Sequence, residues 1–248
     1  MTLFIGKPLI ALGDTDSTNL YLKNYIEQFD AQEGMTVTAE FQLAGRGQRG
    51  TIWESAPRKN ILTSILLKPD FLMPSNQFYL GKAAGLAVYD TIKEVIGDEL
   101  LTIKWPNDIL YNKQKVAGIL IENSLQGQKI KYSIAGFGIN VNQDEFATTI
   151  ATSLKLISGK DQNQIGLLNP LFEHLEGRYL QLKNGDLHTI DSEYEKVLYG
   201  INKTLEFTET KSDKTEKGTI KGVTEDGLLR VAYNTGERTY GFKEVKYL

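Results

Sequence analysis

The spacing of hydrophobic and polar positions predicts alternating helices and strands over most of the chain. Apolar residues recur at helical spacing over residues 77–96, whereas residues 35–41 alternate and residues 61–67 form a short apolar run, as strands do. Helices are predicted over residues 20–29, 77–96, 151–182 and 187–198, with breaks near residue 159 and at residues 183–185. Strands are predicted over residues 9–12, 35–41, 61–67, 101–105, 109–111, 115–122 and 129–140.

The pattern changes after residue 203, where short strands follow one another between turn residues. Strands are expected over residues 204–209, 218–223, 228–233 and 237–242, and Asp226-Gly227 is a strong hairpin dipeptide.

The strands between residues 101 and 140 are also joined by tight turns, so they must pair antiparallel and make the main sheet mixed. The predicted fold class is α/β of the α+β type: a mixed β-sheet with helices packed on it, followed by a small SH3-like β-barrel. We place the boundary near Gly200, which divides the chain into domains of residues 1–199 and 200–248.

Composition excludes several kinds of site. The 248 residues carry a net charge of −3 and contain no cysteine and only two histidines. Disulfides, thiolate nucleophiles and cysteine-bound zinc are therefore excluded, and a Ser-His-Asp triad has little material. The sequence shows no signal peptide and no apolar run long enough to span a bilayer, so we expect a cytoplasmic protein that does not bind membranes. An enzyme with this inventory would work by positioning and electrostatics.

A glycine- and arginine-rich stretch occupies residues 41–53. It contains Gly45, Arg46, Gly47, Arg49 and Gly50, and Trp53 closes it. Glycine permits close approach to a ligand, and arginine offers a fork of donors to carboxylate or phosphate, so the stretch suits a mobile cover over an anionic small molecule. A flexible surface loop with solvated arginines explains this stretch alone equally well. The glycine spacing also matches a dinucleotide-binding fingerprint, but that motif needs a helix after the third glycine, and residues 51–53 are β-like.

Other candidate residues lie in the predicted strands and turns. Gly118, Gly136 and Gly138 interrupt two strands, where glycine marks either a bulge or close approach by a ligand. Their proximity to a turn bearing Asn107 and Asp108 favours a floor beneath a ligand.

Lysine and arginine in a site with few histidines favour phosphoryl or adenylyl transfer, and Lys115 is the lysine we single out. Asp108 is the candidate ligand for Mg²⁺, or the group that steers an amine. Asn107 and Asn140 could read an adenine edge, because an amide offers both a donor and an acceptor. Residues 14–19 are rich in capping side chains, and either Ser17 or Thr18 is expected to cap the following helix.

Four motifs stand in order across residues 14–142. They are Asp16-Ser17-Thr18-Asn19; Gly45-Arg46-Gly47-Gln48-Arg49-Gly50-Thr51-Ile52-Trp53; Lys104-Trp105-Pro106-Asn107-Asp108; and Lys115-Val116-Ala117-Gly118-Ile119-Leu120-Ile121-Glu122 with Gly136-Phe137-Gly138-Ile139-Asn140-Val141. Each motif alone has modest specificity, but the ordered set resembles the biotin–protein ligase family (biotin–acetyl-CoA-carboxylase ligases). Residues 151–154 and the terminal strands also fit, so the resemblance covers essentially the whole chain.

The resemblance implies a two-step reaction. Biotin and ATP·Mg²⁺ give biotinyl-AMP and pyrophosphate, and a lysine of the biotin carboxyl carrier domain of an acyl-CoA carboxylase then takes the biotinyl group. Lys115, Arg46 and Asp108 would be catalytic, and Arg49, Trp53, Asn107 and Asn140 would bind ATP or the adenylate. Biotin would be bound by Ser17, Thr18, Asn19, Gln42, Gly45, Arg46, Gly47, Gln48, Lys115, Gly118, Gly136 and Gly138.

The chain departs from the family pattern at Gln48 and Thr51, where the usual loop carries basic residues. We therefore expect the activated intermediate to be held less firmly. The first predicted strand starts near residue 9, which leaves no room for the DNA-binding winged helix of larger ligases, so DNA binding is not expected. Exposed edges of the hairpin strands could pair in a homodimer, but no residue in the sequence decides whether they do.

Three competing functions remain to be tested. A lipoate-type protein ligase has a similar fold, although its acyltransferase branch needs a cysteine that this chain lacks. A non-catalytic sensor of biotin or adenylate is opposed by the presence of Lys115 and Asp108. An RNA-binding module is opposed by the negative net charge.

Overall fold

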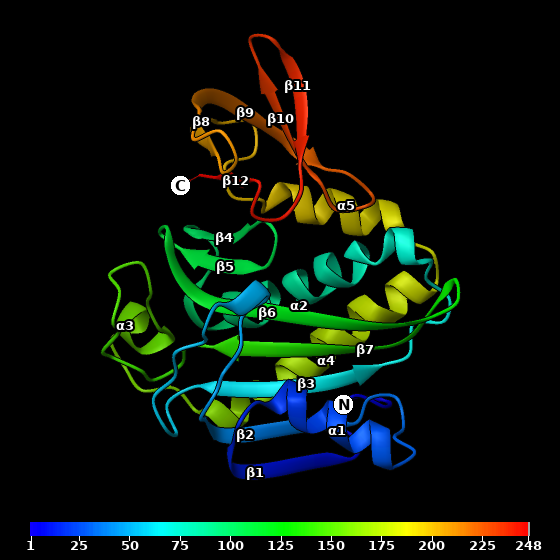
Figure 1. Cartoon of the computed structure of the whole chain (residues 1–248). Helices are drawn as coiled ribbons and strands as arrows, with labels where there is room; N and C mark the ends of the chain where they lie inside the picture. The colour runs from blue at the N-terminus through cyan, green and yellow to red at the C-terminus, as the bar shows by residue number, and fades with distance from the viewer. Residues whose placement is uncertain (248) are drawn as a thin grey trace.

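The computed structural model describes residues 1–247, apart from the side chain of Arg49, as two β-sheets with helices around and between them (Figure 1). The larger sheet has seven strands in the order β1-β2-β3-β7-β6-β5-β4. These strands are β1 Leu9–Thr15, β2 Thr36–Gln42, β3 Ile61–Leu67, β4 Leu101–Lys104, β5 Asp108–Tyr111, β6 Gln114–Gln126 and β7 Lys129–Ile139. Only the pair β1–β2 is parallel among them, so the predicted mixed sheet is confirmed.

Helices cover both faces of this sheet. They are α1 Thr18–Gln28, α2 Phe78–Ile96, α3 Leu154–Ser158, α4 Gln164–Lys183 and α5 Leu187–Lys196, with short 3₁₀ turns η1 Gln48–Gly50 and η2 Pro74–Asn76. All seven residues of β3 are buried, because α1 packs on one face and the layer of α2 and α4 lies on the other (Figure 1). The sheet therefore has a small core beneath α1 and a larger one beneath α2 and α4.

Several predicted elements have different limits in the structure, and β6 and β9 are longer than predicted, at Gln114–Gln126 and Thr215–Val223. Strand β1 continues to Thr15 instead of ending near residue 12, because Asp14 and Thr15 pair with Phe41 and Gln42 of β2. The helix predicted from residue 151 begins only at Leu154, since residue 151 forms a β-bridge with Lys115 instead.

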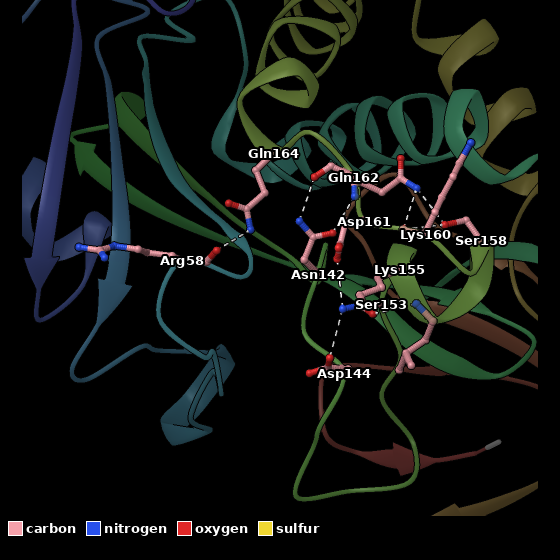
Figure 2. A network of polar contacts seen from close by, with 11 residues as sticks. Arg58, Asn142, Asp144, Ser153, Lys155, Ser158, Lys160, Asp161, Gln162 and Gln164 are labelled. Atoms are coloured by element: carbon pink, nitrogen blue, oxygen red, sulfur yellow. Dashed lines mark hydrogen bonds and ion pairs between the residues drawn. The ribbon is translucent and has the colours of Figure 1, made fainter.

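The connection between α3 and α4 is held by a polar network (Figure 2). The amide of Asn142 pairs with the main chain of Gln162 through two hydrogen bonds of 2.8 and 2.9 Å. Lys155 lies between the carboxylates of Asp144 and Asp161, at 3.3 and 3.1 Å. These contacts fix the end of β7 against the following helices and leave the break near residue 159 where it was predicted.

The C-terminal strands form a separate antiparallel sheet in the order β11-β10-β9-β8-β12. They are β8 Thr204–Glu209, β9 Thr215–Val223, β10 Leu229–Tyr233, β11 Gly236–Tyr240 and β12 Val245–Lys246. The predicted small β region is confirmed, but β11 and β12 are not hydrogen-bonded neighbours, so the described strands do not close into a barrel. The division at residue 200 stays a prediction.

Buried contacts fix the C-terminal sheet against the turn that follows β4. The Trp105 indole nitrogen donates to the main-chain oxygen of Gly227 at 2.9 Å, and the Tyr247 hydroxyl donates to the main-chain oxygen of Trp105 at 3.3 Å. Phe207, Tyr247 and Trp105 belong to one continuous hydrophobic core. The C-terminal sheet therefore lies in a defined place over the larger sheet.

Helix α2 carries one buried charge within this core. The Lys82 side chain is 2% exposed, and its ammonium lies 2.5 Å from Asp191 of α5. The Tyr79 hydroxyl donates to the same carboxylate at 2.7 Å, so the desolvated lysine is compensated. None of the helices in the described part of the chain combines the length and hydrophobicity that crossing a bilayer requires.

Candidate functional site

A cavity of about 1090 Å³ lies between the larger sheet and the C-terminal sheet. Most of the residues predicted to bind a ligand line it, although they come from separate parts of the chain. They are Ser17, Thr18, Asn19, Gln42, Arg46, Gly47, Gln48, Trp53, Asn107, Asp108, Lys115, Gly118, Gly136 and Gly138. Arg46 and Lys115 thus share one cavity.

Glycine residues form the floor of the cavity on β6 and β7. Gly118 of β6 pairs directly with Gly138 of β7. Phe137, between Gly136 and Gly138, belongs to the core on the other face of the sheet. A Cβ atom added at Gly138 would lie 2.4 Å from the Trp53 ring, and one added at Gly118 would lie 2.9 Å from it. The glycines therefore let a flat ring lie directly on the sheet. Among the described residues, the Trp53 indole nitrogen is buried without a hydrogen-bond partner.

The glycine- and arginine-rich stretch forms a small hairpin over this floor. The main-chain nitrogen of Trp53 donates to the main-chain oxygen of Gly45 at 2.9 Å, and that of Gly47 donates to the main-chain oxygen of Thr51 at 2.7 Å. The 3₁₀ turn η1 lies at the tip of the hairpin. Gly45 is a buried residue of this hairpin and does not line the cavity. The side chain of Arg49 lies outside the described part of the structure, so its predicted phosphate contact stays a prediction.

Polar side chains gather where α1 begins. The Gln42 side-chain oxygen accepts from the Thr18 nitrogen at 2.8 Å and from the Thr18 hydroxyl at 3.0 Å. Ser64 of β3 donates to Asn19 at 2.5 Å, and the Asn19 amide nitrogen donates to Glu122 at 2.8 Å. At this end of the cavity, hydroxyl and amide side chains are held in fixed positions.

The expected helix cap is only partly as predicted. Ser17 occupies the N-cap position of α1, but its side chain makes no capping hydrogen bond. The side chain of Gln42 takes the nearby Thr18 nitrogen instead. Ser64 was not predicted as part of this group, although its pairing with Gly136 puts it on the cavity face of the sheet.

Charged side chains gather at the other end. The Lys115 ammonium lies 2.6 Å from the Asp108 carboxylate, with 32% and 28% of the two side chains exposed. It also lies 5.4 Å from the centre of the Trp53 ring. Main-chain hydrogen bonds to residues 150 and 152 fix Lys115 at the start of β6. Arg46 lies nearer the polar end, because Glu122, 3.9 Å away from it, also accepts from Asn19. This exposed ion pair contributes little to stability.

The described lining of the cavity carries an excess of positive charge. Its cationic side chains are Arg46, Lys104, Lys115, Lys243 and Lys246, and its carboxylates are Asp108 and Glu206. This excess contrasts with the net charge of −3 of the whole chain and favours an anionic ligand. Lys104 belongs to a recognised motif but had no predicted role. The two lysines of the C-terminal sheet carried no signal in the sequence.

The two asparagines predicted to face adenine differ in position. Asn107 lines the cavity while its amide nitrogen donates to the Ile119 oxygen at 2.8 Å. The structure does not bring Asn140 to the cavity, because its side chain is 3% exposed and donates to Thr152 at 3.0 Å. Asn140 thus connects the end of β7 to the segment before α3.

Lys104 is expected to titrate below the ordinary lysine value. Burial lowers the pKa of Lys104 from 10.5, and the positive charge of Lys115 lowers it further, while Asp108 opposes both effects. We expect the NMR signal of reductively ¹³C-methylated Lys104, assigned with a Lys104→Arg variant, to titrate below 10.5 in the folded protein. The same signal in urea should titrate at the ordinary value, and equal midpoints in the two states would contradict this expectation.

The fold and the cavity define an α/β protein with a cationic cavity between two sheets, which suits an anionic small molecule. Sequence comparison identifies its family. A model of the biotin/lipoate A/B protein ligase family matches residues 13–140. The bifunctional ligase/repressor BirA of Bacillus subtilis is 33% identical over 245 residues, covering 95% of this chain and 72% of that protein. The biotin–[acetyl-CoA-carboxylase] ligase of Mycobacterium tuberculosis is 31% identical over 185 residues, covering 73% of this chain and 67% of that protein.

Structural comparison agrees. A biotin protein ligase from Aquifex aeolicus, solved in complex with biotin and ATP, matches with a TM-score of 0.81 and 26% identity, covering 98% of this chain and 99% of that one. The chain therefore belongs to the biotin/lipoate A/B protein ligase family, as its four motifs indicated.

Proposed function

We propose that this protein is a biotin–protein ligase that makes biotinyl-AMP and transfers the biotinyl group to a lysine of a carboxylase carrier domain. The observation that carries this proposal is one cavity with amide and hydroxyl side chains, beside Arg46, at one end and the ammonium groups of Lys104 and Lys115 at the other. Biotin has a neutral polar head, an apolar tail and a carboxylate, so it needs both kinds of end. The biotin and ATP complex of the Aquifex aeolicus relative supports the same substrates.

In the first step a biotin carboxylate oxygen attacks the α-phosphorus of ATP, and pyrophosphate leaves. Thr18, Asn19 and Gln42 would bind the polar head, because their side chains lie together at the start of α1. Lys115 would lie between the carboxylate and the α-phosphate and neutralise the charge that develops there. Arg46 would close over the product, and Trp53 would pack against it.

In the second step the amine of an acceptor lysine attacks the carbonyl carbon of biotinyl-AMP, and AMP leaves. Asp108 lies 2.6 Å from Lys115, so it is close to the reacting group and can attract the incoming amine. The mixed anhydride is already reactive, so positioning is the main requirement.

Magnesium would accompany ATP. The described residues contain no cluster of three or more histidine, cysteine or acidic side chains that could hold a metal ion. Mg²⁺ usually binds one or two carboxylates and completes its shell with substrate phosphates and water, which fits a cavity holding Asp108 and Glu206. When bound, it would neutralise phosphate charge, and Asp108 is the proposed protein ligand.

One incubation tests the function. The protein is mixed with α-³²P-labelled ATP, Mg²⁺ and either biotin or lipoate, and the acyl-adenylate is separated by thin-layer chromatography. We expect a labelled adenylate with biotin and transfer of biotin to an added carrier domain. An adenylate with lipoate alone would assign a lipoate-type ligase, and binding of biotin without any adenylate would assign a sensor.

Replacing Gln48 with arginine is expected to slow escape of biotinyl-AMP. Gln48 lines the cavity, and a cation there would add a charge-assisted hydrogen bond to the phosphate, which we expect to slow dissociation about tenfold. The dissociation rate is measured by chasing preformed adenylate with unlabelled ligand. Gln126→Arg, at the exposed end of β6, controls for net charge. Equal rates for Gln48→Arg and the original protein would contradict the proposal.

We also propose cytoplasmic action, no DNA binding and pairing of two copies through β1, an edge strand of the larger sheet. The opposite edge strand, β4, already exchanges main-chain hydrogen bonds with Val197 and Tyr199. Light scattering would measure the dimer. A salt-dependent, sequence-specific shift of DNA in gel electrophoresis would contradict the expectation that the protein does not bind DNA.

A further inference from the structure

A second hollow, of about 240 Å³, adjoins the cavity described above. The two share Gln48, Pro106, Asn107 and Ile119 in their linings. The remaining walls come from the start of α2, from β6 and from the turn between β9 and β10. The hollow is therefore a side opening next to the turn that bears Asp108.

The two spaces differ in charge. Asp226 is the only charged side chain among the described residues that line the hollow, whereas five cationic side chains line the main cavity. Asn123 and Gln77 add amide groups, joined by a hydrogen bond of 2.7 Å. The Asn123 side-chain oxygen is buried and has no hydrogen-bond partner within residues 1–247.

Apolar surfaces complete the walls of the hollow. Phe78 and Gly81 of α2 lie on one side, and Ile119 and Ile121 of β6 lie on another. At about 240 Å³ the hollow is smaller than the roughly 300–1,000 Å³ of ordinary small-molecule pockets, so one long side chain fits better than a nucleotide.

We propose that this hollow admits the acceptor lysine of the carrier domain, a step that rests on the function proposed above. Its aliphatic stem would lie along Phe78 and Ile121, and its ammonium would first meet Asp226 and the amide oxygens. ATP and biotinyl-AMP are anionic and belong in the cationic cavity, so charge directs the two substrates to different openings.

At the inner end of the hollow, the acceptor amine would take the biotinyl group from AMP. The ammonium releases one proton to water, and the amine nitrogen forms a bond to the biotinyl carbonyl carbon. The bond from that carbon to the phosphate oxygen breaks, and AMP leaves with the electron pair. The new amide nitrogen releases a second proton to water. The nearby positive charges of Lys104 and Lys115 favour the neutral amine once it has passed the hollow.

The packing of the turn between β9 and β10 fixes the walls of the hollow relative to residues 105–108. A Cβ atom at Gly227 would lie 2.5 Å from the Phe78 ring, so the turn bearing Asp226 packs closely on the start of α2. The same turn accepts the Trp105 hydrogen bond at 2.9 Å. Asp226 is thereby fixed relative to the turn of residues 105–108.

Filling the hollow tests the proposal. A Cβ atom at Gly81 would have only the Phe78 ring nearby, at an ordinary 3.7 Å, so alanine is accommodated there. Because Gly81 lines the hollow, we expect the longer leucine side chain to fill part of it. In single-turnover assays with preformed biotinyl-AMP, Gly81→Leu should slow transfer to a recombinant biotin carboxyl carrier domain at least tenfold. Gly81→Ala should transfer at the original rate. Both should form biotinyl-AMP and react with hydroxylamine, a small neutral nucleophile, as the original protein does.

Reversing the charge provides a second test that leaves α2 unchanged. Asp226→Lys should raise KM for the carrier domain about tenfold with little change in kcat, and Glu225→Lys, an exposed neighbour outside the hollow, should not. Normal carrier transfer by both Gly81→Leu and Asp226→Lys, with adenylate still formed, would overturn this inference alone. Failure of the original protein to form biotinyl-AMP would overturn the proposed function instead.

Discussion

Replacing Lys115 with methionine is expected to slow biotinyl-AMP formation about 100- to 1,000-fold, the usual effect of removing one preorganised group that stabilises transition-state charge. Methionine keeps the length and apolar body of the side chain, so contact with the Trp53 ring is retained while the ammonium is lost. The rate is measured by single-turnover formation of labelled biotinyl-AMP. Biotin affinity should fall much less than the rate, because the polar end of the cavity is unchanged.

The Lys115 experiment needs two controls. Lys131→Met removes an exposed lysine from β7 and should leave the rate unchanged. Lys115→Met leaves the Asp108 carboxylate without its partner at 2.6 Å. Comparing the double variant Lys115→Met/Asp108→Asn with Asp108→Asn alone separates the effect of an unpaired acid from the proposed role of Asp108 as a Mg²⁺ ligand. If the single variant makes adenylate at the original rate, Lys115 has no part in the first step.

Replacing Gly136 with alanine is expected to weaken biotin binding about tenfold to a hundredfold. The added Cβ would lie 2.2 Å from the Asn19 side-chain oxygen, which accepts a hydrogen bond from Ser64 at 2.5 Å. Asn19 must then move and leave buried polar groups unpaired, at a cost of about 1–3 kcal/mol for each group. Isothermal titration with biotin measures the loss, and thermal unfolding should show a lower Tm.

The matched control for Gly136→Ala is Gly13→Ala. A Cβ atom at Gly13 in β1 would have nothing within 4 Å, so this variant should keep both stability and affinity. Adding Asn19→Ser to Gly136→Ala should restore part of the stability without restoring biotin affinity. Unchanged biotin affinity in Gly136→Ala would show that the start of α1 does not bind the polar head of the ligand.

Local patterns in the sequence were sufficient for the antiparallel strands of residues 101–140 and for the glycine floor of the cavity. The alternation of residues along β6 and β7 puts Gly118, Gly136 and Gly138 on one face, and short turns make neighbouring strands antiparallel. Periodicity could not place Asn140, whose side chain turns into the connection to α3 because main-chain oxygen atoms of that connection are close. The limits of β1 depended on a parallel partner, which no local pattern reveals.

The sequence by itself therefore determined the kind and approximate place of most elements, the glycine floor and the family motifs, because each depends on residues close together in the chain. Only the tertiary structure decided that Lys243 and Lys246 lie in the same cavity as Lys115, and that Gly81 and Asp226 line one hollow. These groupings arise from the packing of the C-terminal sheet on Trp105 and α2, a contact between distant segments. The spacing of residues along the chain does not predict a contact between such distant segments.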